Sequence, residues 1–560
     1  MAKIVKKAKT GLRSLSRSSG TSGVETSPLR PKLVEKMPPC INTCPNHNRI
    51  REMITAISRT EDFGLSFDET LAKAFYIFLE TTPFPSVCGR VCPHPCETQC
   101  NRKDKEGAVG INNLERFIGD YGLSKNLKPK LISETKRSEK IAIIGSGPAG
   151  MSCAYQLARR GYPVTVFEAF PKTGGMLRYG IPDYRLPQNI LDAEMQRIIE
   201  LGVELKTNTI VGKDIAYEDL KKDYKAIFVG IGAHQGIKLR IKGEDAPNVF
   251  TGTAFLHRIN TGERLDVGDH VVVVGGGDTA IDAARVARRL GAKATILYRR
   301  TRAEMPAICE EIEGAEEEGV AIEYLAAPIE IYQENGKAVG AKCQRMQLGE
   351  PDSSGRRRPV PIEGDTFDLK FSTLIAAISQ EPDFTGFDKL IDGKDWIKID
   401  EKGQTRDAGT FSGGDDIELG LVITAIYHGR MAALAIDELI ANQPMPVPEK
   451  LDLITLDKMA HTYFPEAQPV KAKQMAVEER LKSLDAEITS TLTFEEAVAE
   501  SKRCMSCGLC FDCGTCWSLC QDNAIVKPLV RGQEYKFKLE FCNGCKKCAE
   551  NCPCGYIEMH

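Results

Sequence analysis

The sequence predicts a multidomain α/β protein with cysteine-rich segments at both ends. Three observations predict this class. Two strand–glycine loop–helix–strand units lie in the middle of the chain, six clustered cysteines precede them, and eleven cysteines follow near the C-terminus. With 560 residues, the chain is long enough for about three or four domains at roughly 150 residues each.

The composition excludes several classes of function. Hydrophobic residues make up 42% and charged residues 27%, which is typical of soluble globular proteins. The net charge is −3, so no global basic field favours nucleic-acid binding. No run of 18 apolar residues predicts a membrane span. The chain also lacks an apolar signal segment, so the cysteines indicate metal binding rather than disulfides, and a cytoplasmic protein is expected.

Residues 1–36 are basic and Ser-rich, which predicts a flexible tail. Ile4, Ala8 and Leu12 also have the spacing of a short amphipathic docking helix, and the shortage of acidic residues fits a transit peptide. These three interpretations stay open. Residues 37–130 then show mainly helical patterning at 49–57, 69–79 and 111–118, and they hold the first six clustered cysteines.

The first dinucleotide motif begins after an apolar strand at 140–144. The loop Gly145-Ser-Gly147-Pro-Ala-Gly150 leads into a helix and then into a second strand that ends at Glu168. The glycines permit a tight turn and close approach of backbone N–H groups to a pyrophosphate, which the helix N-terminus also favours. Glu168 is placed to accept hydrogen bonds from ribose hydroxyls. We therefore expect a Rossmann-like unit that binds FAD.

The second motif repeats this order at 271–298, with Gly275-Gly-Gly277-Asp-Thr-Ala280 as its loop. At the position that corresponds to Glu168 stands Tyr298, followed by Arg299 and Arg300. Two guanidinium groups suit the 2′-phosphate of NADPH better than the free ribose of NADH. The sequence therefore predicts an NADPH site, with NADH as the alternative.

Two further segments are expected to complete the FAD site. The stiff Gly- and Pro-rich loop 174–187, with Gly175 and Arg185, lets a flat cofactor approach the backbone. Gly414 and Asp415 follow a strand and precede a helical run at 421–439. Asp415 is expected to contact the ribityl and pyrophosphate region, while the start of the helix places its positive dipole end near the flavin.

The C-terminal cysteines form two successive runs with x2-x2-x3 spacing, which is the bacterial pattern for two [4Fe–4S] clusters. In such pairs the fourth cysteine of each run ligates the other cluster. One expected ligand set is Cys510, Cys513, Cys516 and Cys552, and the other is Cys542, Cys545, Cys548 and Cys520. Zinc bound by thiolates is the alternative that this doubled spacing disfavours.

Six motifs in this order resemble the small (beta) subunit family of NADPH-dependent glutamate synthase: Gly145–Gly150, Gly174–Pro187, Gly275–Ala280, Tyr298–Arg300, Ile378–Asp383 and Gly413–Asp415. The resemblance covers about residues 37–440 and implies an NADPH domain inserted into an FAD domain. We therefore expect a tail at 1–36, a helical [4Fe–4S] domain at 37–130, the FAD domain at 131–258 and 376–442, the NAD(P)H domain at 259–375, a linker with one helix at 443–503, and a ferredoxin-like domain at 504–560.

The resemblance also implies ligands for two N-terminal clusters. One set is Cys44, Cys92 and Cys96 with Glu115 as the fourth ligand, for which Cys88 competes. Cys40 and Cys100 belong to a second cluster, but the CxxC pair that lies upstream in the family is missing here. A similar pair, Cys504 and Cys507, lies just before the C-terminal runs. We expect it to complete this cluster, either within one chain or across a homodimer, which brings the expected total to four clusters.

These parts predict an oxidoreductase that moves electrons between NADPH or NADH, FAD, the clusters and a protein partner. The segment from Ser27 to Cys40, together with the C-terminal runs, resembles the DsrL subgroup of flavoproteins encoded with dissimilatory sulfite reductase. That resemblance implies a sulfite reductase partner in sulfur metabolism. The alternatives are a glutamate synthase small subunit that serves a large amidotransferase subunit, and a non-enzymatic electron-transfer subunit. The direction of electron flow stays open.

Overall fold

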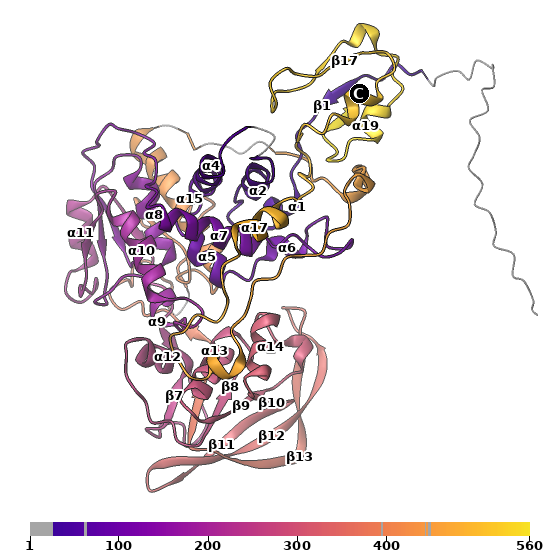
Figure 1. The fold of residues 1–560 in the computed structure, drawn as a ribbon. Helices are drawn as coiled ribbons and strands as arrows, with labels where there is room; N and C mark the ends of the chain where they lie inside the picture. The colour runs from indigo at the N-terminus through magenta and orange to yellow at the C-terminus, as the bar shows by residue number, and fades with distance from the viewer. Residues whose placement is uncertain (1–25, 61–63, 394–395, 443, 446–449) are drawn as a thin grey trace, which may run out of the picture.

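The computed structural model describes residues 26–60, 64–393, 396–442, 444–445 and 450–560. Most of the expected basic tail, including the positions of its alternative docking helix, lies outside these residues. A helical region and a first sheet occupy the middle of the molecule, a second sheet lies at one end, and a small C-terminal unit lies at the other (Figure 1). None of the helices in the described part of the chain is long and apolar enough to span a membrane.

The helical region contains α1 (Pro39–Thr43), α2 (Ile50–Ser58), α4 (Phe67–Leu79), α5 (Pro85–Val91), α6 (Pro95–Thr98) and α7 (Ile111–Ser124). A capping box between Ser66 and Glu69 begins α4. Helices α5 and α7 pack closely because Gly119 has no side chain: a Cβ there would collide with the backbone of Ser86. This packing brings Cys88 of α5 and its C-cap residue Cys92 next to α7.

The first sheet is parallel, with strand order β16-β5-β2-β3-β4. Its strands are β2 (Ile141–Ile144), β3 (Val164–Phe167), β4 (Glu204–Lys206), β5 (Ala226–Val229) and β16 (Thr410–Ser412). The associated helices are α8 (Pro148–Ala158), α9 (Met176–Tyr179), α10 (Gln188–Ile199), α11 (Tyr217–Asp223) and α15 (Val422–Ala441). Helix α15 packs against α8 where Gly429 leaves no room for a side chain beside the Ala149 carbonyl.

The second sheet is also parallel, with order β10-β9-β8-β14-β7. It contains β7 (Val249–Thr251), β8 (His270–Val274), β9 (Lys293–Tyr298), β10 (Ala321–Tyr324) and β14 (Thr373–Ala376), with α12 (Gly252–Asn260), α13 (Asp278–Arg289) and α14 (Cys309–Glu317). Strand β7 therefore pairs within this sheet although it precedes the boundary expected at residue 259. The chain passes from the first sheet to the second and later returns. The short strands β6 (Gln235–Gly236) and β15 (Gln380–Glu381) lie on these two connections and pair with each other.

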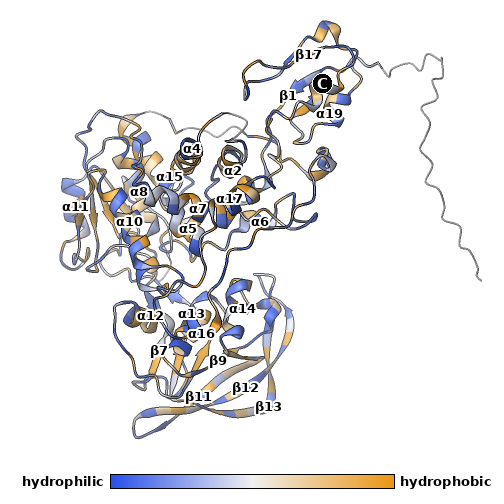
Figure 2. Ribbon diagram, viewed as in Figure 1, coloured by the Kyte–Doolittle hydropathy of each residue, from blue (hydrophilic) through white to orange (hydrophobic). Residues whose placement is uncertain are grey.

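An antiparallel sheet of three long strands extends from the second sheet: β11 (Ala326–Glu334), β12 (Lys337–Pro351) and β13 (Arg357–Lys370). In Figure 2 the strands β7 and β9 are mainly hydrophobic, whereas β12 and β13 alternate between hydrophobic and hydrophilic residues. No residue of β13 is buried: each is exposed or half-buried along the whole strand.

One hydrophobic core runs through the helical region and the first sheet, while the second sheet has a core of its own. The shared core includes Phe75 and Phe84 from the helical region together with Tyr155 and Phe228 from the first-sheet region. Cysteines of the helical region are part of the same core. The expected cluster sites of this region are therefore held rigidly against the first sheet.

The remaining elements come from the two ends of the chain. They are α16 (Val477–Arg480), α17 (Phe494–Ser501), α18 (Thr515–Leu519), β17 (Ile525–Val526), β18 (Lys536–Phe537), α19 (Lys547–Glu550), β19 (Ile557–Met559) and β1 (Pro31–Leu33). The expected linker thus holds two helices, α16 and α17, rather than one. Residues 474–507, here called the strap, run from the second sheet past the helical region to the C-terminal unit (Figure 1).

Strand β1 corrects the expectation that residues 26–36 belong to a flexible tail. It pairs antiparallel with β19, with Pro31 opposite Met559 and Leu33 opposite Ile557. Lys36 is buried and forms an ion pair with Glu558. The backbone hydrogen bonds of β19 thus order a segment whose basic composition alone predicts disorder.

Candidate functional site

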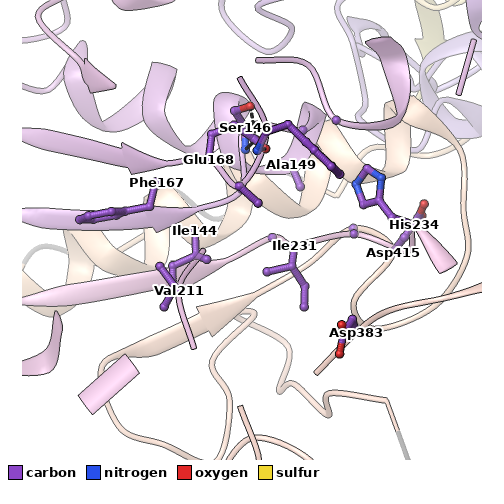
Figure 3. A pocket seen from close by; sticks show the side chains of 18 of the residues that line it. Ile144, Ser146, Ala149, Phe167, Glu168, Val211, Ile231, His234, Asp383 and Asp415 are labelled. Atoms are coloured by element: carbon purple, nitrogen blue, oxygen red, sulfur yellow. Dashed lines mark hydrogen bonds between the residues drawn. The ribbon is translucent and has the colours of Figure 1, made fainter. Parts of the chain in front are cut away.

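The first glycine loop lines a cavity of about 510 Å³ at the carboxyl ends of β2 and β3 (Figure 3). Gly145 has a positive φ of 95°, and a Cβ there would collide with the Gly230 carbonyl. Gly147 lines the cavity, while Gly150 lies behind the loop, against the carbonyl of Gly145. The backbone of this loop is therefore open to a ligand, because no side chain covers it.

Glu168 fixes this loop as well as lining the cavity. Its carboxylate accepts hydrogen bonds from the backbone N–H groups of Ser146 (2.9 Å) and Phe170 (2.8 Å). It also accepts from the Ser146 hydroxyl. Each carboxylate oxygen has more than one lone pair, so Glu168 can still accept from a ribose hydroxyl. Gly175 and Gly414 line the same cavity.

Asp415 lines both this cavity and a second one. Burial raises the pKa of its carboxyl to about 6, and the backbone N–H of Gly420 donates to it at 3.1 Å. Figure 3 shows Asp415 and His234 at one end of the first cavity, away from Phe167. Sequence reasoning missed His234. Burial lowers its pKa to about 4, so the ring is neutral at pH 7.

Arg185 does not line either cavity, in contrast to the expectation. Its guanidinium is buried and forms an ion pair with Asp282 of α13 at 2.7 Å. The neighbouring Tyr184 hydroxyl donates to the same carboxylate at 2.9 Å. The loop 182–187 therefore anchors the first-sheet region to the second-sheet region. The bare glycine backbone of the first cavity and Glu168 fit FAD.

The second cavity, of about 570 Å³, is lined by Gly275, Gly277, Arg299 and Arg300. Ala280 is fully buried and lies under the loop rather than in the cavity. Arg300 is nearly buried, donates to the Arg357 carbonyl and pairs with Asp352, both at 2.7 Å. Arg299 is exposed and has no such anchor among the described contacts.

Arg356 is a lining residue that sequence reasoning missed. It lies in the turn between β12 and β13, where Asp352 N donates to the Arg356 carbonyl at 2.8 Å. Partial desolvation by the cavity walls, and then the positive charges of Arg300 and Arg356, lower the pKa of Arg299, although its side chain stays accessible to solvent. Three guanidinium groups at one cavity favour an anion. These residues fit the adenosine 2′-phosphate of NADPH.

Four buried side chains of the helical region converge: Cys44, Cys92, Cys96 and Glu115. Burial raises the pKa of Glu115, and its Oε1 atom has no hydrogen-bond partner. Cys88 is fully buried beside the same group. An unpaired buried carboxylate oxygen among thiols fits a metal-containing group, because it otherwise costs about 1–3 kcal/mol.

The strap brings Cys504 and Cys507 to Cys40 and Cys100, and all four line one cavity. Arg51 of α2 donates to the carbonyl of Cys507 at 3.0 Å, and Arg102 donates to that of Arg503 at 2.5 Å. Buried charged groups thus hold this part of the strap in place. The Asn101 side-chain amide points at the Cys507 sulfur, 3.6 Å away.

The C-terminal unit contains two further cysteine-lined cavities. One is lined by Cys510, Cys513, Cys516, Cys552 and Cys554, and the other by Cys520, Cys542, Cys545 and Cys548. Backbone N–H groups donate to the sulfurs of Cys510 (3.4 Å), Cys520 (3.3 Å) and Cys552 (3.3 Å), as is favourable for thiolate ligands. Cys554, which sequence reasoning left without a role, lies 3.8 Å from the Cys552 sulfur.

The chain is similar to known protein families over most of its length. Residues 139–429 match the family described as pyridine nucleotide-disulphide oxidoreductase, and residues 33–127 match dihydropyrimidine dehydrogenase domain II, 4Fe-4S cluster. Among the described residues that line the first cavity, none is a cysteine, so no redox disulfide lies there.

Three curated relatives span most of the chain. The NADPH-Fe(3+) oxidoreductase subunit beta of Geobacter sulfurreducens is 38% identical, over 84% of this chain and 75% of that protein. The NADP(+)-dependent formate dehydrogenase subunit beta of Moorella thermoacetica is 38% identical, over 84% and 70%. The glutamate synthase [NADPH] small chain of Escherichia coli is 35% identical, over 71% and 87%. The chain belongs to the glutamate synthase small-subunit family of NAD(P)H-dependent iron–sulfur flavoprotein oxidoreductases.

Proposed function

We propose that the protein moves electrons between a nicotinamide nucleotide in the second cavity and a protein partner, through FAD in the first cavity and four [4Fe–4S] clusters. The observation that carries this proposal is Asp415, which lines both cavities. The two nucleotides would therefore meet there, as hydride transfer requires. When bound, FAD supplies the conversion between two-electron hydride transfer and one-electron transfer.

The residues of the two cavities bind and orient rather than exchange protons. The loop backbones at Gly145–Gly150 and Gly275–Gly277 would hold the pyrophosphates at the N-termini of α8 and α13. Arg299 and Arg356 would hold the 2′-phosphate, and Arg300 would anchor the turn that carries Arg356. Neutral His234 and Asp415, which are both half-buried, would exclude water from the point where the cavities meet.

Four sets of ligands would form the electron path. Cys44, Cys92, Cys96 and Glu115 would hold the cluster in the core that is shared with the first sheet. Cys40, Cys100, Cys504 and Cys507 would hold the next, where the strap meets the helical region. The two sets in the C-terminal unit would form a ferredoxin-like domain at the end of the path. Cys88 would then be a buried neighbour rather than a ligand.

The domain order of the proposal is helical [4Fe–4S] domain, FAD domain with the inserted NAD(P)H domain, strap and ferredoxin-like domain. Two of the relatives are named beta subunits and one is named a small chain, which supports a protein partner for this chain as well. We propose dissimilatory sulfite reductase as that partner, in the cytoplasm. The basis is the resemblance of the segment from Ser27 to Cys40 and of the C-terminal runs to the DsrL subgroup.

The proposal is tested by analysing the cofactors and the activity of the anaerobically purified chain. It predicts one FAD and about sixteen irons per chain, with NADPH-dependent reduction of a sulfite reductase in the same assay. About eight irons per chain in a fully loaded sample would mean that only the two C-terminal clusters are present. Reduction of dyes but not of sulfite reductase would refute the partner while leaving the enzyme activity intact.

A further inference from the structure

We propose that an apolar surface on the C-terminal unit docks an acidic electron-transfer protein. We call it the hairpin surface and define it by six exposed apolar side chains: Trp517, Val526, Leu529, Val530, Leu539 and Phe541. The proposal deepens the proposed function and rests on it, because that function needs an exit from the electron path. Figure 1 shows β17 in the C-terminal unit, on the opposite side of the helical region from the second sheet.

The six side chains belong to one local structure. Strands β17 and β18 pair with Val526 opposite Lys536, and Leu529 and Val530 lie in the turn that follows β17. Lys527 lies over the Trp517 ring, 5.7 Å from its centre, and so joins the end of β17 to α18. The N–H of Lys538 donates to Ala524 at 2.8 Å, which brings the segment with Leu539 and Phe541 beside β17.

The exposure of this group is unusual for a unit of its size. Leu529 is fully exposed, Val530 is 61% exposed and Phe541 is 58% exposed. A single exposed apolar residue needs no explanation, but a contiguous group marks an interaction site. A small unit has few apolar side chains to stabilise its core, and six that stay on the surface contribute little to folding but can be buried by a partner.

The hairpin surface lies next to the expected cluster ligands. Trp517 directly follows Cys516 on α18, and Phe541 directly precedes Cys542. These two cysteines line different cavities. A protein docked on the hairpin surface would therefore be close to both clusters of the C-terminal unit.

The charge around the surface indicates the kind of partner. Residues 515–548 contain six Lys or Arg residues against three Asp or Glu residues, whereas the whole chain carries a net charge of −3. Lys527, Lys536 and Lys538 are exposed on the hairpin or directly after it. Basic side chains interspersed with apolar ones are complementary to an acidic protein face, and such charges increase the rate of association at low salt. The surface therefore fits an acidic redox protein better than a symmetric contact with a second copy of this chain, which would bring two basic surfaces together.

The test uses the holoenzyme with two protein acceptors of opposite charge, an acidic ferredoxin and the basic cytochrome c. The variant carries Leu529→Glu and Val530→Glu, and a matched control carries Leu131→Glu and Ile132→Glu at another exposed apolar pair. Iron content and NADPH-dependent ferricyanide reduction are measured for each protein. They report on folding and on the proposed function independently of docking.

We expect kcat/KM for the ferredoxin to fall at least about tenfold in the hairpin variant and to be unchanged in the control. We also expect this kcat/KM to fall with added salt, and ferricyanide reduction and iron content to stay at wild-type levels. Unchanged ferredoxin reduction in the hairpin variant, or a preference for cytochrome c, would overturn the proposal. So would a wild-type dimer that the hairpin variant converts to monomers. If the wild-type protein did not reduce ferricyanide with NADPH, that result would instead refute the proposed function.

Discussion

Arg299 and Arg356 present two guanidinium groups to the second cavity, whereas Arg300 is held by Asp352 and the Arg357 carbonyl. Replacing both Arg299 and Arg356 with Ala should raise the KM for NADPH roughly ten- to a hundredfold. Charge-assisted contacts to the 2′-phosphate contribute about 1.5–3 kcal/mol, and NADH does not make them. The KM for NADH should therefore hardly change in steady-state assays.

Arg345→Ala is the matched control, because Arg345 lies on β12, pairs with Glu323 and does not line the cavity. Arg300→Ala should instead disturb the turn that carries Arg356. Equal loss of activity with NADPH and NADH in the Arg299/Arg356 variant would show that these side chains do not bind the 2′-phosphate.

The buried carboxyl group of Glu194 makes the stability of the protein depend on pH. It is fully buried on α10, accepts hydrogen bonds from Ser86 N and Val87 N at 3.0 Å, and burial raises its pKa to about 7. In the unfolded chain a glutamate titrates near 4.3. Between these values the folded state keeps the proton that the unfolded state has lost, so stability falls as the pH rises from about 4 to about 7.

Glu194→Gln should remove this contribution, which is on the order of 3 kcal/mol above pH 7. The thermal midpoint of the wild type should fall more between pH 5 and pH 8 than that of the variant, as followed by flavin fluorescence. Glu200→Gln, at the exposed C-cap of the same helix, is the control. The same pH dependence in wild type and Glu194→Gln would contradict this assignment.

At the residue scale, the sequence predicts what depends on local spacing. The glycine loops and the C-terminal cysteine runs are short patterns, and most of their members line the cavities described here. Gly150, Ala280 and Arg185 lie outside the two nucleotide cavities. Arg356 could not be predicted, because a turn between two long strands brings it to the cavity. His234 could not be predicted either, because nothing in its neighbouring residues distinguishes it from a surface histidine.

At the scale of elements, the strap joins parts that the fold otherwise separates. Arg480 of α16 pairs with Glu317 of α14 at 2.9 Å, and Ile488 N donates to Tyr184 O at 3.2 Å. Glu487 pairs with Arg90 of α5 at 2.7 Å and with Arg116 of α7 at 2.8 Å. The strap therefore links the second-sheet region to the helical region.

Glu487→Ala should destabilise the protein by about 1–3 kcal/mol, because it leaves two largely buried guanidinium groups short of a partner. The expected result is a lower thermal midpoint with unchanged NADPH-dependent dye reduction. Glu478→Ala, at an exposed position on α16, should have little effect. A Glu487→Ala variant as stable as the wild type would show that this contact does not hold the strap.

Composition predicted the strap only as a linker with one helix. Its two helices are short, and many of its contacts are polar and reach residues far away in the sequence. Such contacts leave no periodic pattern. By contrast, α2, α4 and α7 were expected close to their observed positions, because each presents one apolar face to a common core.

At the scale of the whole molecule, the two ends of the described chain meet. Strand β1 pairs with β19, Leu33 lines one cysteine cavity of the C-terminal unit, and Pro31 lines the other. The parallel sheets were expected from the two strand–loop–helix units. The pairing of β1 with β19 was not expected, because a strand of three residues is too short to show the alternation of apolar and polar residues that identifies a strand.

The most direct test of the central claim is anaerobic rapid mixing of the holoenzyme with NADPH, with absorbance following the flavin and electron paramagnetic resonance following the clusters. The variant is Cys504→Ser with Cys507→Ser, and Cys309→Ser, at an exposed thiol of α14, is the control. The account predicts that the variant lacks about four irons, that its flavin is reduced at the wild-type rate, and that its C-terminal clusters stay oxidised. Wild-type iron content together with wild-type reduction of the C-terminal clusters in this variant would contradict the account.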